Sequence, residues 1–379
     1  MTGNCWGKHI GPALLMGALA LFFFVGAAAG QSIRDLPPPP PPPTPRPTPI
    51  PTPTPEPKDE DFDVVRVSSN LVMVPVSVVD AAGQPILGLQ VNDFRLEEQN
   101  RLQEITEIGN PEQVPLDIAL LFDISSSVSQ KGFFQFQQAA AAAFLKQVMK
   151  PVDRAAVFTI AEEPRMASPL APSEVAAAKI LGIPPANAPV PTAFYDTVSA
   201  AAKYLASNSA DRHRRVIMVI SDGDDNFSRV VKDASLAEYR ASERGELSPS
   251  GARRNLIERR RVAVGDVQKA VQQADAAFYS INPGGPSVRL NQISMGAQNA
   301  MRSIAESTGG NAFIPGSETD LERVFSEIAA ELRGQYLLLY YSNLKSAPAQ
   351  FRTIKVSVPT RSNSRVRARQ GYYPKTADN

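Results

Sequence analysis

The sequence predicts an α/β domain inserted between the two halves of a smaller, β-sandwich-like domain. Two observations lead to this fold class. In the middle of the chain, short continuous apolar runs alternate with helical stretches, as expected of a mostly parallel sheet with helices on both faces. Before and after that region lie runs rich in β-branched residues, separated by turn residues and typical of antiparallel strands.

The first 30 residues have the layout of a secretory signal peptide. Lys8 is followed by the uncharged residues 10–30, which end in small side chains at AAAG. We therefore expect residues 1–30 to direct export to the periplasm or out of the cell and to be removed. The alternative is an uncleaved membrane anchor over residues 10–30, since about 20 apolar residues span a bilayer.

Residues 31–61 are expected to form a proline-rich linker. Proline fixes φ and lacks an N–H donor, so the run PPPPPPPTPRPTPIPTPTPEP favours an extended, semi-rigid spacer. A recognition motif for proline-binding modules is the alternative interpretation. Either way, the segment separates the export signal from the folded part of the chain.

Composition excludes several classes of function. The 39 Lys and Arg residues balance 38 Asp and Glu residues, and a net charge of +1 argues against a nucleic-acid binder. The one cysteine, Cys5, lies before the apolar segment, so the exported protein would have no disulfide, thiolate zinc site or cysteine nucleophile.

Strands are expected at both ends of the folded part. Residues 62–112 read as the first half of the β domain, broken by the turn residues AAGQP and EEQN. Residues 334–379 contain three further strand-like runs, QYLLLYYSN, FRTIKVSVPT and SRVRARQGYYP. Because a few strands alone are marginally stable, we expect the two halves to pack together.

Residues 113–333 are expected to form the α/β domain. Its strands are predicted at LDIALLFD, DRAAVFTI, RRVIMVIS and AAFYSINP, with helices at 132–149, 193–207, 264–274 and 300–308. Residues 226–262 read as a charged, weakly periodic insertion, and two roles stay open for it. It either forms a rim beside a binding site or is a mobile surface segment. The run Glu258–Arg261 within it is interpreted as a solvated helix face.

Oxygen-bearing side chains follow three of the predicted strands and loops. Asp123, Ser125 and Ser127 end the first strand, Thr192 precedes a helix, and Asp222 follows a buried strand. Loops at the carboxyl ends of parallel strands converge on one edge of the sheet. Two carboxylates and three hydroxyls make a hard oxygen site, which suits Mg²⁺, Mn²⁺ or Ca²⁺.

This constellation resembles the metal-ion-dependent adhesion site of von Willebrand factor type A (VWFA) domains, which are Rossmann-like. The resemblance covers residues 114–333 and rests on Asp-x-Ser-x-Ser, the downstream Thr and the strand-terminal Asp-Gly. It implies direct metal contact by Ser125, Ser127 and Thr192, with Asp123 and Asp222 acting through water. In that family a ligand carboxylate often completes the metal's shell.

The flanking segments are similar to secreted bacterial VWFA-related domain proteins, over nearly the whole exported chain. One departure concerns the threonine loop, which usually carries glycines but here reads PVPTAFYD. Because prolines stiffen this loop, Thr192 is the ligand that the resemblance supports least.

Catalysis is not expected. An aspartyl nucleophile of the phosphoryl-transfer type needs a second acid two residues on, where Ser125 stands. A serine nucleophile needs a base. His9 lies in the signal and His213 reads as a solvated turn residue, and the chain has no phosphate-binding glycine loop.

The sequence thus predicts an exported, non-enzymatic protein whose divalent cation holds an acidic group of a protein, matrix or envelope partner. The alternative is a structural envelope or assembly scaffold whose A-type domain does not use its metal site. Neither interpretation involves nucleic acid, and a membrane enters only through an uncleaved N-terminal segment.

Overall fold

The computed structural model describes residues 71–125, 134–186, 188, 190–284, 292–344 and 350–374. The expected signal peptide, the linker and Ser127 lie outside the described residues. Within those residues, no helix combines the length and the apolar character needed to cross a membrane.

The central sheet has six strands in the order β10–β9–β8–β5–β6–β7. Five of them run parallel, and β7 is antiparallel to β6 at one edge. The strands are β5 (Leu116–Asp123), β6 (Arg154–Ile160), β7 (Arg165–Ala171), β8 (Arg214–Ile220), β9 (Ala276–Ile281) and β10 (Ala312–Phe313). The carboxyl ends of the parallel strands therefore share one edge of the sheet.

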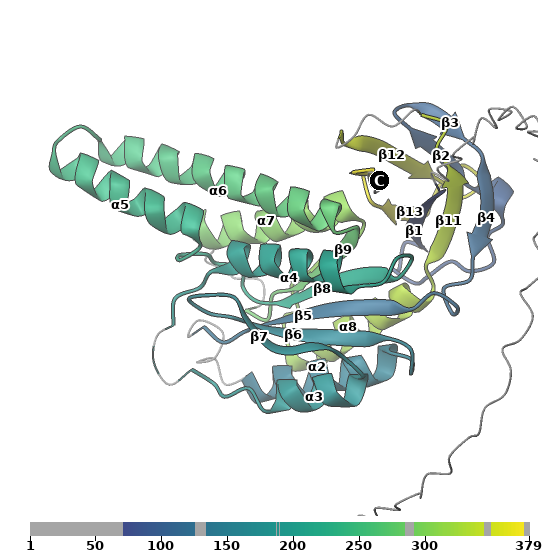
Figure 1. Ribbon diagram of the computed structural model, residues 1–379, viewed down its shortest axis with the longest axis horizontal. Coiled ribbons are helices and arrows are strands. Elements are labelled where there is room, and N and C mark those ends of the chain that lie inside the picture. Colours follow the sequence, from purple (N-terminus) through teal and green to yellow (C-terminus); the bar gives the residue numbers. More distant parts are fainter. Residues whose placement is uncertain are drawn as a thin grey trace, which may run out of the picture. The chain divides into compact units, whose positions relative to one another are not determined.

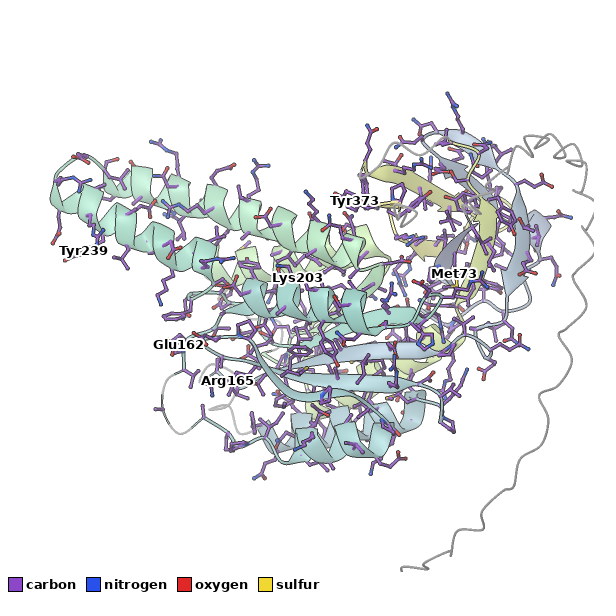
Figure 2. The ribbon with its side chains drawn as sticks, viewed as in Figure 1. Met73, Glu162, Arg165, Lys203, Tyr239 and Tyr373 are labelled. Atoms are coloured by element: carbon purple, nitrogen blue, oxygen red, sulfur yellow. The ribbon has the colours of Figure 1, made fainter. Side chains whose placement is uncertain are left out.

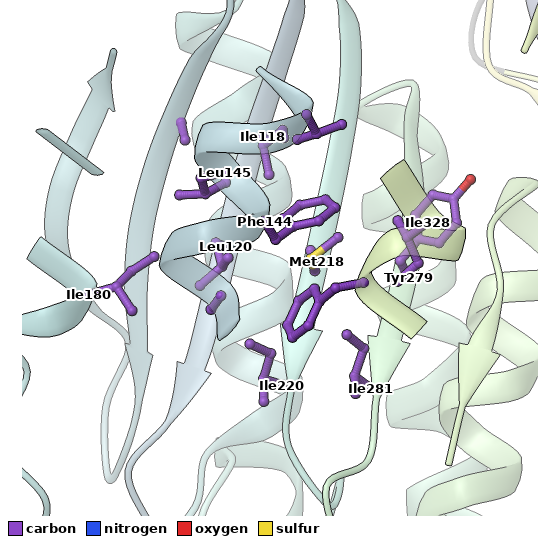
Figure 3. Close-up of a cluster of buried hydrophobic side chains, with 14 of the residues drawn as sticks. Ile118, Leu120, Phe144, Leu145, Ile180, Met218, Ile220, Tyr279, Ile281 and Ile328 are labelled. Carbon is purple, nitrogen blue, oxygen red and sulfur yellow. The ribbon is translucent and has the colours of Figure 1, made fainter. Parts of the chain in front are cut away.

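Helices cover both faces of this sheet (Figure 1). One face carries α2 (Phe134–Val148), α3 (Ser173–Leu181) and α8 (Glu318–Arg333), and the other carries α4 (Phe194–Asn208), α6 (Pro249–Gln273) and α7 (Gln292–Thr308). All eight residues of β5 are buried, which explains the continuous apolar run over residues 118–122. Ile118 and Leu120 pack with Phe144 of α2 (Figure 3), whereas Leu121 packs on the opposite face.

Residues 229–262 form a helical hairpin, which we call the helical arm. It consists of α5 (Arg229–Glu243) and the first half of α6, which begins at Pro249 with the Ser248 side chain accepting a hydrogen bond from the Gly251 N–H. α5 and α6 lie side by side and extend beyond the sheet (Figure 1), joined by an ion pair of 2.5 Å between Glu238 and Arg259. The helix that the sequence predicted at 264–274 therefore starts 15 residues earlier, at Pro249.

The prediction of a solvated face for Glu258–Arg261 is only half right. Glu258 and Arg261 are exposed and pair with each other, as expected. Arg259 and Arg260 are half-buried, because one binds Glu238 and the other donates to the Asp225 carbonyl at 3.3 Å. Arg259 thus joins α5 to α6, and Arg260 joins the arm to the loop after β8.

The remaining strands form two four-stranded sheets, in the orders β13–β1–β11–β4 and β14–β12–β2–β3. Their buried side chains share one cluster, to which Val74, Leu96, Leu338 and Ile354 belong. The first half comprises β1 (Leu71–Val79), a 3-10 turn (Val91–Asp93), β2 (Arg95–Glu98), β3 (Arg101–Gln103) and β4 (Ile105–Gly109). The second half comprises β11 (Tyr336–Tyr341), β12 (Arg352–Ser357), β13 (Arg365–Ala368) and β14 (Gly371–Tyr372).

Strands from the two halves pair directly with one another. β1 lies antiparallel between β11 and β13, and β2 pairs with β12. The predicted fold class is therefore confirmed: a mostly parallel α/β sheet lies between strands that form additional sheets.

The chain enters and leaves the α/β unit at neighbouring points. Gly109 at the end of β4 pairs with Leu337 at the start of β11. Arg214 fastens the same region, because its N–H donates to the Pro115 carbonyl at 2.9 Å and its guanidinium donates to the Leu332 carbonyl at 2.7 Å. One residue thus holds both ends of the unit, through its backbone N–H at one end and its buried guanidinium at the other.

Candidate metal centre

Asp123 is a fully buried carboxylate at the carboxyl end of β5. Its Oδ1 accepts a hydrogen bond of 2.8 Å from the Ser125 N–H. Its Oδ2 accepts one of 2.5 Å from the hydroxyl of Ser221, the first residue after β8. The ends of the two central strands are therefore joined through this side chain.

The electrostatics of Asp123 disfavour its negative charge in the absence of a cation. Burial raises the pKa of the Asp123 carboxyl to about 6, and repulsion from the Asp222 carboxylate acts in the same direction. The hydrogen bonds from Ser221 and Ser125 oppose this rise in pKa without cancelling it. Asp123 and Asp222 thus form a pair of carboxylates that a positive charge at this edge would stabilise.

Asp222 lies on the loop that follows β8, and it is half-buried. The next residue, Gly223, has φ +75°, and its N–H donates to the Ser221 hydroxyl at 2.9 Å. A Cβ at Gly223 would lie 2.8 Å from the Met301 Cε. The backbone conformation therefore favours glycine here, and any larger residue would also displace the Met301 side chain.

Thr192 is buried and its loop is tied to the loop after β8. Its N–H donates to the Asn226 side-chain oxygen at 2.8 Å, and its carbonyl accepts from the N–H groups of Asn226 and Phe227, each at 3.1 Å. These bonds fix the position of the threonine loop despite its prolines.

Asp225 fastens the same two loops from the other side. Its Oδ2 accepts from the Tyr195 N–H at 2.8 Å, at the start of α4, and from the Ser228 hydroxyl. Burial raises the pKa of its carboxyl, while the hydrogen bonds from Ser228 and Tyr195 lower it. Asp225 thus accepts four hydrogen bonds, from Tyr195, Phe227 and Ser228, and acts as a positioning residue.

The structure brings some of the predicted ligands close together, places one on a neighbouring loop and does not describe another. Asp123 and Ser125 lie together at the end of β5, and Asp222 is close enough to act on the charge of Asp123. Thr192 lies on a different loop, which is joined to the Asp222 loop because the Thr192 N–H donates to Asn226, four residues after Asp222. Ser127 lies outside the described residues. Among those residues, no three His, Cys, Asp or Glu side chains gather as a possible metal cluster.

This donor set fits a hard divalent cation. Its chemistry is all oxygen, with two carboxylates at one sheet edge and with hydroxyl-bearing residues on the adjoining loops. The mutual repulsion of Asp123 and Asp222 provides the second reason, since a cation would relieve it.

Sequence reasoning missed two residues and misjudged a third. Ser221 gave one available signal, because it directly follows a buried strand and precedes Asp222. Asp225 gave none, since three of its four hydrogen bonds come from the neighbouring Phe227 and Ser228, and only the Tyr195 N–H joins it to a distant element. His213 is not a solvated turn residue: its Nδ1 lies 3.0 Å from the Oδ2 of the buried Asp117, which Arg154 also binds at 2.8 Å.

Comparison with known proteins identifies one family. The description "von Willebrand factor type A domain" matches residues 117–327, which is more than half of the chain. No curated protein sequence matches this chain.

Solved structures are similar at the level of the fold. A von Willebrand factor type A protein from Catenulispora acidiphila is 12% identical, with a TM-score of 0.41 over 82% of this chain and 64% of that one. Proximal thread matrix protein 1 from the mussel byssus, with a zinc-occupied MIDAS motif, is 15% identical, with a TM-score of 0.40 over 61% of this chain. The matched part is 48% of that chain, so this chain spans about half the length of the mussel protein.

A pilus protein is also among these structures. The vWF domain of the type V pili tip protein Mfa5 from Porphyromonas gingivalis is 15% identical, with a TM-score of 0.36. The match covers 57% of this chain and 94% of that one.

Proposed function

The chain belongs to the von Willebrand factor type A domain family, and on that premise we propose that it is an exported binding protein. A divalent cation, Mg²⁺ or Mn²⁺ in the first instance, is held by Asp123, Ser125, Ser127, Thr192 and Asp222. That cation holds an acidic group of a protein, matrix or envelope partner. The centre has no catalytic role.

One observation carries this proposal. A carboxylate with no exposed surface, Asp123, stands beside a second carboxylate, Asp222, at the edge where the strands end. Burying a charge against a like charge is costly, so folds keep such pairs where a cation or a proton resolves the conflict. The hydroxyl-bearing loops around the pair supply neutral oxygen atoms for a cation.

The chain's own groups have distinct tasks in this proposal. Asp123 is fixed by Ser125 and Ser221, so its charge stays at the end of β5. Asp225 and Asn226 hold the threonine loop against the loop after β8, which limits the distance between Thr192 and Asp222. When bound, the cation would have neutral hydroxyl oxygens as direct ligands, with the two carboxylates acting through water, so its charge stays under-neutralised and attracts a further anion.

The proposal of a non-enzymatic role is supported by the position of His213. This histidine precedes β8, whereas Ser221 follows the same strand. A side chain at the opposite end of a strand cannot act as a base for a hydroxyl of the centre. His213 is also bound to Asp117.

Titration calorimetry of the full chain tests the metal site. We expect about one Mg²⁺ or Mn²⁺ to bind per wild-type chain and none to bind Asp123→Ala. Asp233→Ala is the matched control, because it removes an exposed carboxylate of α5 and is expected to bind like wild type. Equal binding by Asp123→Ala, or no binding by wild type, contradicts the assignment.

Capture of a partner from an exported fraction, with and without chelator, tests the role of the cation. We expect capture to be lost in chelator and in Asp123→Ala. Capture that persists in both would instead support the scaffold alternative, in which the A-type domain does not use its metal.

A further inference from the structure

A crevice of about 30 Å³ lies at the amino-terminal edge of the central sheet, where the α/β unit meets the β domain. The starts of β8 and β9 and the ends of α6 and α7 line one side of it, and β1 and β14 line the other. Among the described residues that form this lining there are three arginines, Arg214, Arg215 and Arg369, but one carboxylate, Asp275. The crevice is therefore lined by an excess of positive charge.

Two of the three arginines, Arg215 and Arg369, converge on the end of α6. The Arg215 Nη1 donates to the Ala274 carbonyl at 3.1 Å, and Arg369 forms an ion pair with Asp275, the next residue. Arg369 also donates to the Met73 carbonyl of β1 at 2.8 Å, on the side of the β domain nearest the α/β unit (Figure 2). One guanidinium from each part of the chain thus lies beside the same two residues.

The other basic side chains of the lining have partners outside the crevice. The Arg214 guanidinium donates to the Leu332 carbonyl at the end of α8, on the other face of the sheet. The His213 Nδ1 lies 3.0 Å from the Oδ2 of Asp117. The excess charge of the crevice therefore rests mainly on the two guanidinium groups at the end of α6.

Both of these guanidinium groups are buried, and each has one donor to spare. Arg215 is 7% exposed and Arg369 is 9% exposed. The buried Nε–H group of each has no hydrogen-bond acceptor among the described residues. Burial lowers the pKa of Arg215, and it lowers the pKa of Arg369 to about 10. Because a buried charge and a buried donor both cost stability without a partner, the crevice favours an anion that accepts from both groups.

The volume of the crevice limits the anion to a small one. It is close to the share of one molecule in liquid water, about 30 Å³, so it excludes polyatomic anions such as sulfate and phosphate. Chloride is little larger than water and accepts several N–H donors at once. The apolar side chains of Val216 and Ala276 in the lining suit such a weakly hydrated ion. The side chain of Asp275 is 40% exposed, which leaves the crevice accessible from solvent.

We propose that the crevice binds one chloride ion, which accepts from the Nε–H groups of Arg215 and Arg369 and joins the β domain to the α/β unit. Direct bonds already cross this junction, because the Gln370 N–H donates to the Ser307 carbonyl at 3.0 Å. The ion adds a contact whose strength depends on the chloride concentration. A water molecule in the same place would accept from the two donors but leave their charge uncompensated. The proposal is independent of the metal centre, which lies at the opposite edge of the sheet.

Urea unfolding of the full chain tests the site, in chelator and in mixtures of sodium chloride and sodium gluconate at constant ionic strength. A ligand that binds only the folded chain raises the folding equilibrium constant in proportion to its concentration, once that concentration exceeds the dissociation constant. We therefore expect this equilibrium constant to rise about tenfold for each tenfold rise in chloride. Gluconate is too large for the crevice and should not replace chloride.

A pair of variants separates this site from general effects of salt. Arg369→Gln removes one of the two guanidinium groups, so its folding equilibrium constant should change by less than about twofold over the same range of chloride. Arg365→Gln is the matched control, because it makes the same change at an exposed arginine of β13. We expect the control to respond to chloride as wild type does.

Crystals of the full chain grown in bromide give a second measurement, which does not require any variant to fold. We expect an anomalous difference peak in the crevice, between Arg215 and Arg369. Equal stability of wild type in chloride and in gluconate would overturn the proposal and assign the crevice to water. A wild-type response to chloride in Arg369→Gln, or the lack of a bromide peak in the crevice, would overturn it as well.

Discussion

Replacing Asp123 by asparagine is expected to stabilise the metal-free protein at neutral pH while abolishing cation binding. The wild-type carboxylate is buried beside Asp222, and this environment raises its pKa from 3.8 to about 6. Asparagine has nearly the same shape and carries no charge at any pH. The substitution therefore removes the electrostatic conflict together with the ligand.

The magnitude follows from the shift in pKa. A rise of roughly two units, at 1.36 kcal/mol per unit, corresponds to about 3 kcal/mol. Because the folded-state pKa is raised, the native protein holds more protons than the unfolded chain between these two values. The contribution of Asp123 to stability is thus unimpaired below about pH 4, declines as pH rises through about 6, and is lowest at neutral pH.

Urea unfolding of wild type and Asp123→Asn in chelator, from about pH 4 to about pH 7, measures this effect. The free energy of unfolding of the variant, relative to wild type, should increase by about 3 kcal/mol over that range. The loss of an acceptor for the Ser221 hydroxyl changes this difference by about 1 kcal/mol, but equally at every pH, so it does not alter the slope.

Adding Mg²⁺ should reverse the ranking at neutral pH. A cation present at 1,000 times its dissociation constant stabilises the wild-type protein by about 4.1 kcal/mol, which exceeds the deficit of about 3 kcal/mol, and leaves the variant unchanged. A difference between the two proteins that does not change with pH would refute the assignment of a destabilising charge to Asp123.

Two further predictions concern the loop after β8 and the β domain. Gly223→Ala strains a backbone at φ +75° and places a Cβ against Met301. The substitution should lower the free energy of unfolding by about 1–3 kcal/mol, measured by urea unfolding. It should also weaken Mg²⁺ binding, measured by calorimetry. Wild-type values in both assays would contradict the role given to this glycine. Deleting residues 350–379 removes Ile354, Val358 and Tyr372 from the buried cluster of the β domain. Burial of each such side chain stabilises the fold by about 1.5–3 kcal/mol. Protease should therefore cut the shortened chain near β1 first. Continued protection of β1 would show that the two halves of the β domain are independent.

Four parallel strands, β5, β6, β8 and β9, could be predicted in order because burial on both faces leaves a direct trace in the sequence, whereas the two-residue, half-buried β10 could not. β5 and β8 are buried at every position, and their central residues 118–122 and 216–220 read as continuous apolar runs. Strand β7 was not predicted, since its run includes Pro169 and exposed positions, as expected of an edge strand. The residues at the ends of the strands could be predicted because their polarity interrupts these runs.

The helical arm could not be predicted as helix because it lacks a wide apolar stripe. α5 buries Val231 but exposes Leu236 and Tyr239, so its hydrophobic pattern does not point to one face. Its contact with α6 depends on the Glu238–Arg259 pair, which comes from residues 21 apart. For the same reason the role of Asp225 could not be predicted, because its bond to the Tyr195 N–H joins residues 30 apart.

The pairing of Gly109 with Leu337 has a consequence for the order of folding. Roughly 230 residues separate this pair, and closing a flexible loop of that length costs about 5 kcal/mol in chain entropy. A folded α/β unit removes most of that cost beforehand, because Arg214 already holds Pro115 and Leu332 together at the two ends of the loop. We therefore expect the inserted unit to fold first and the β sheets to close afterwards, although β1 leaves the ribosome before any strand of the insert.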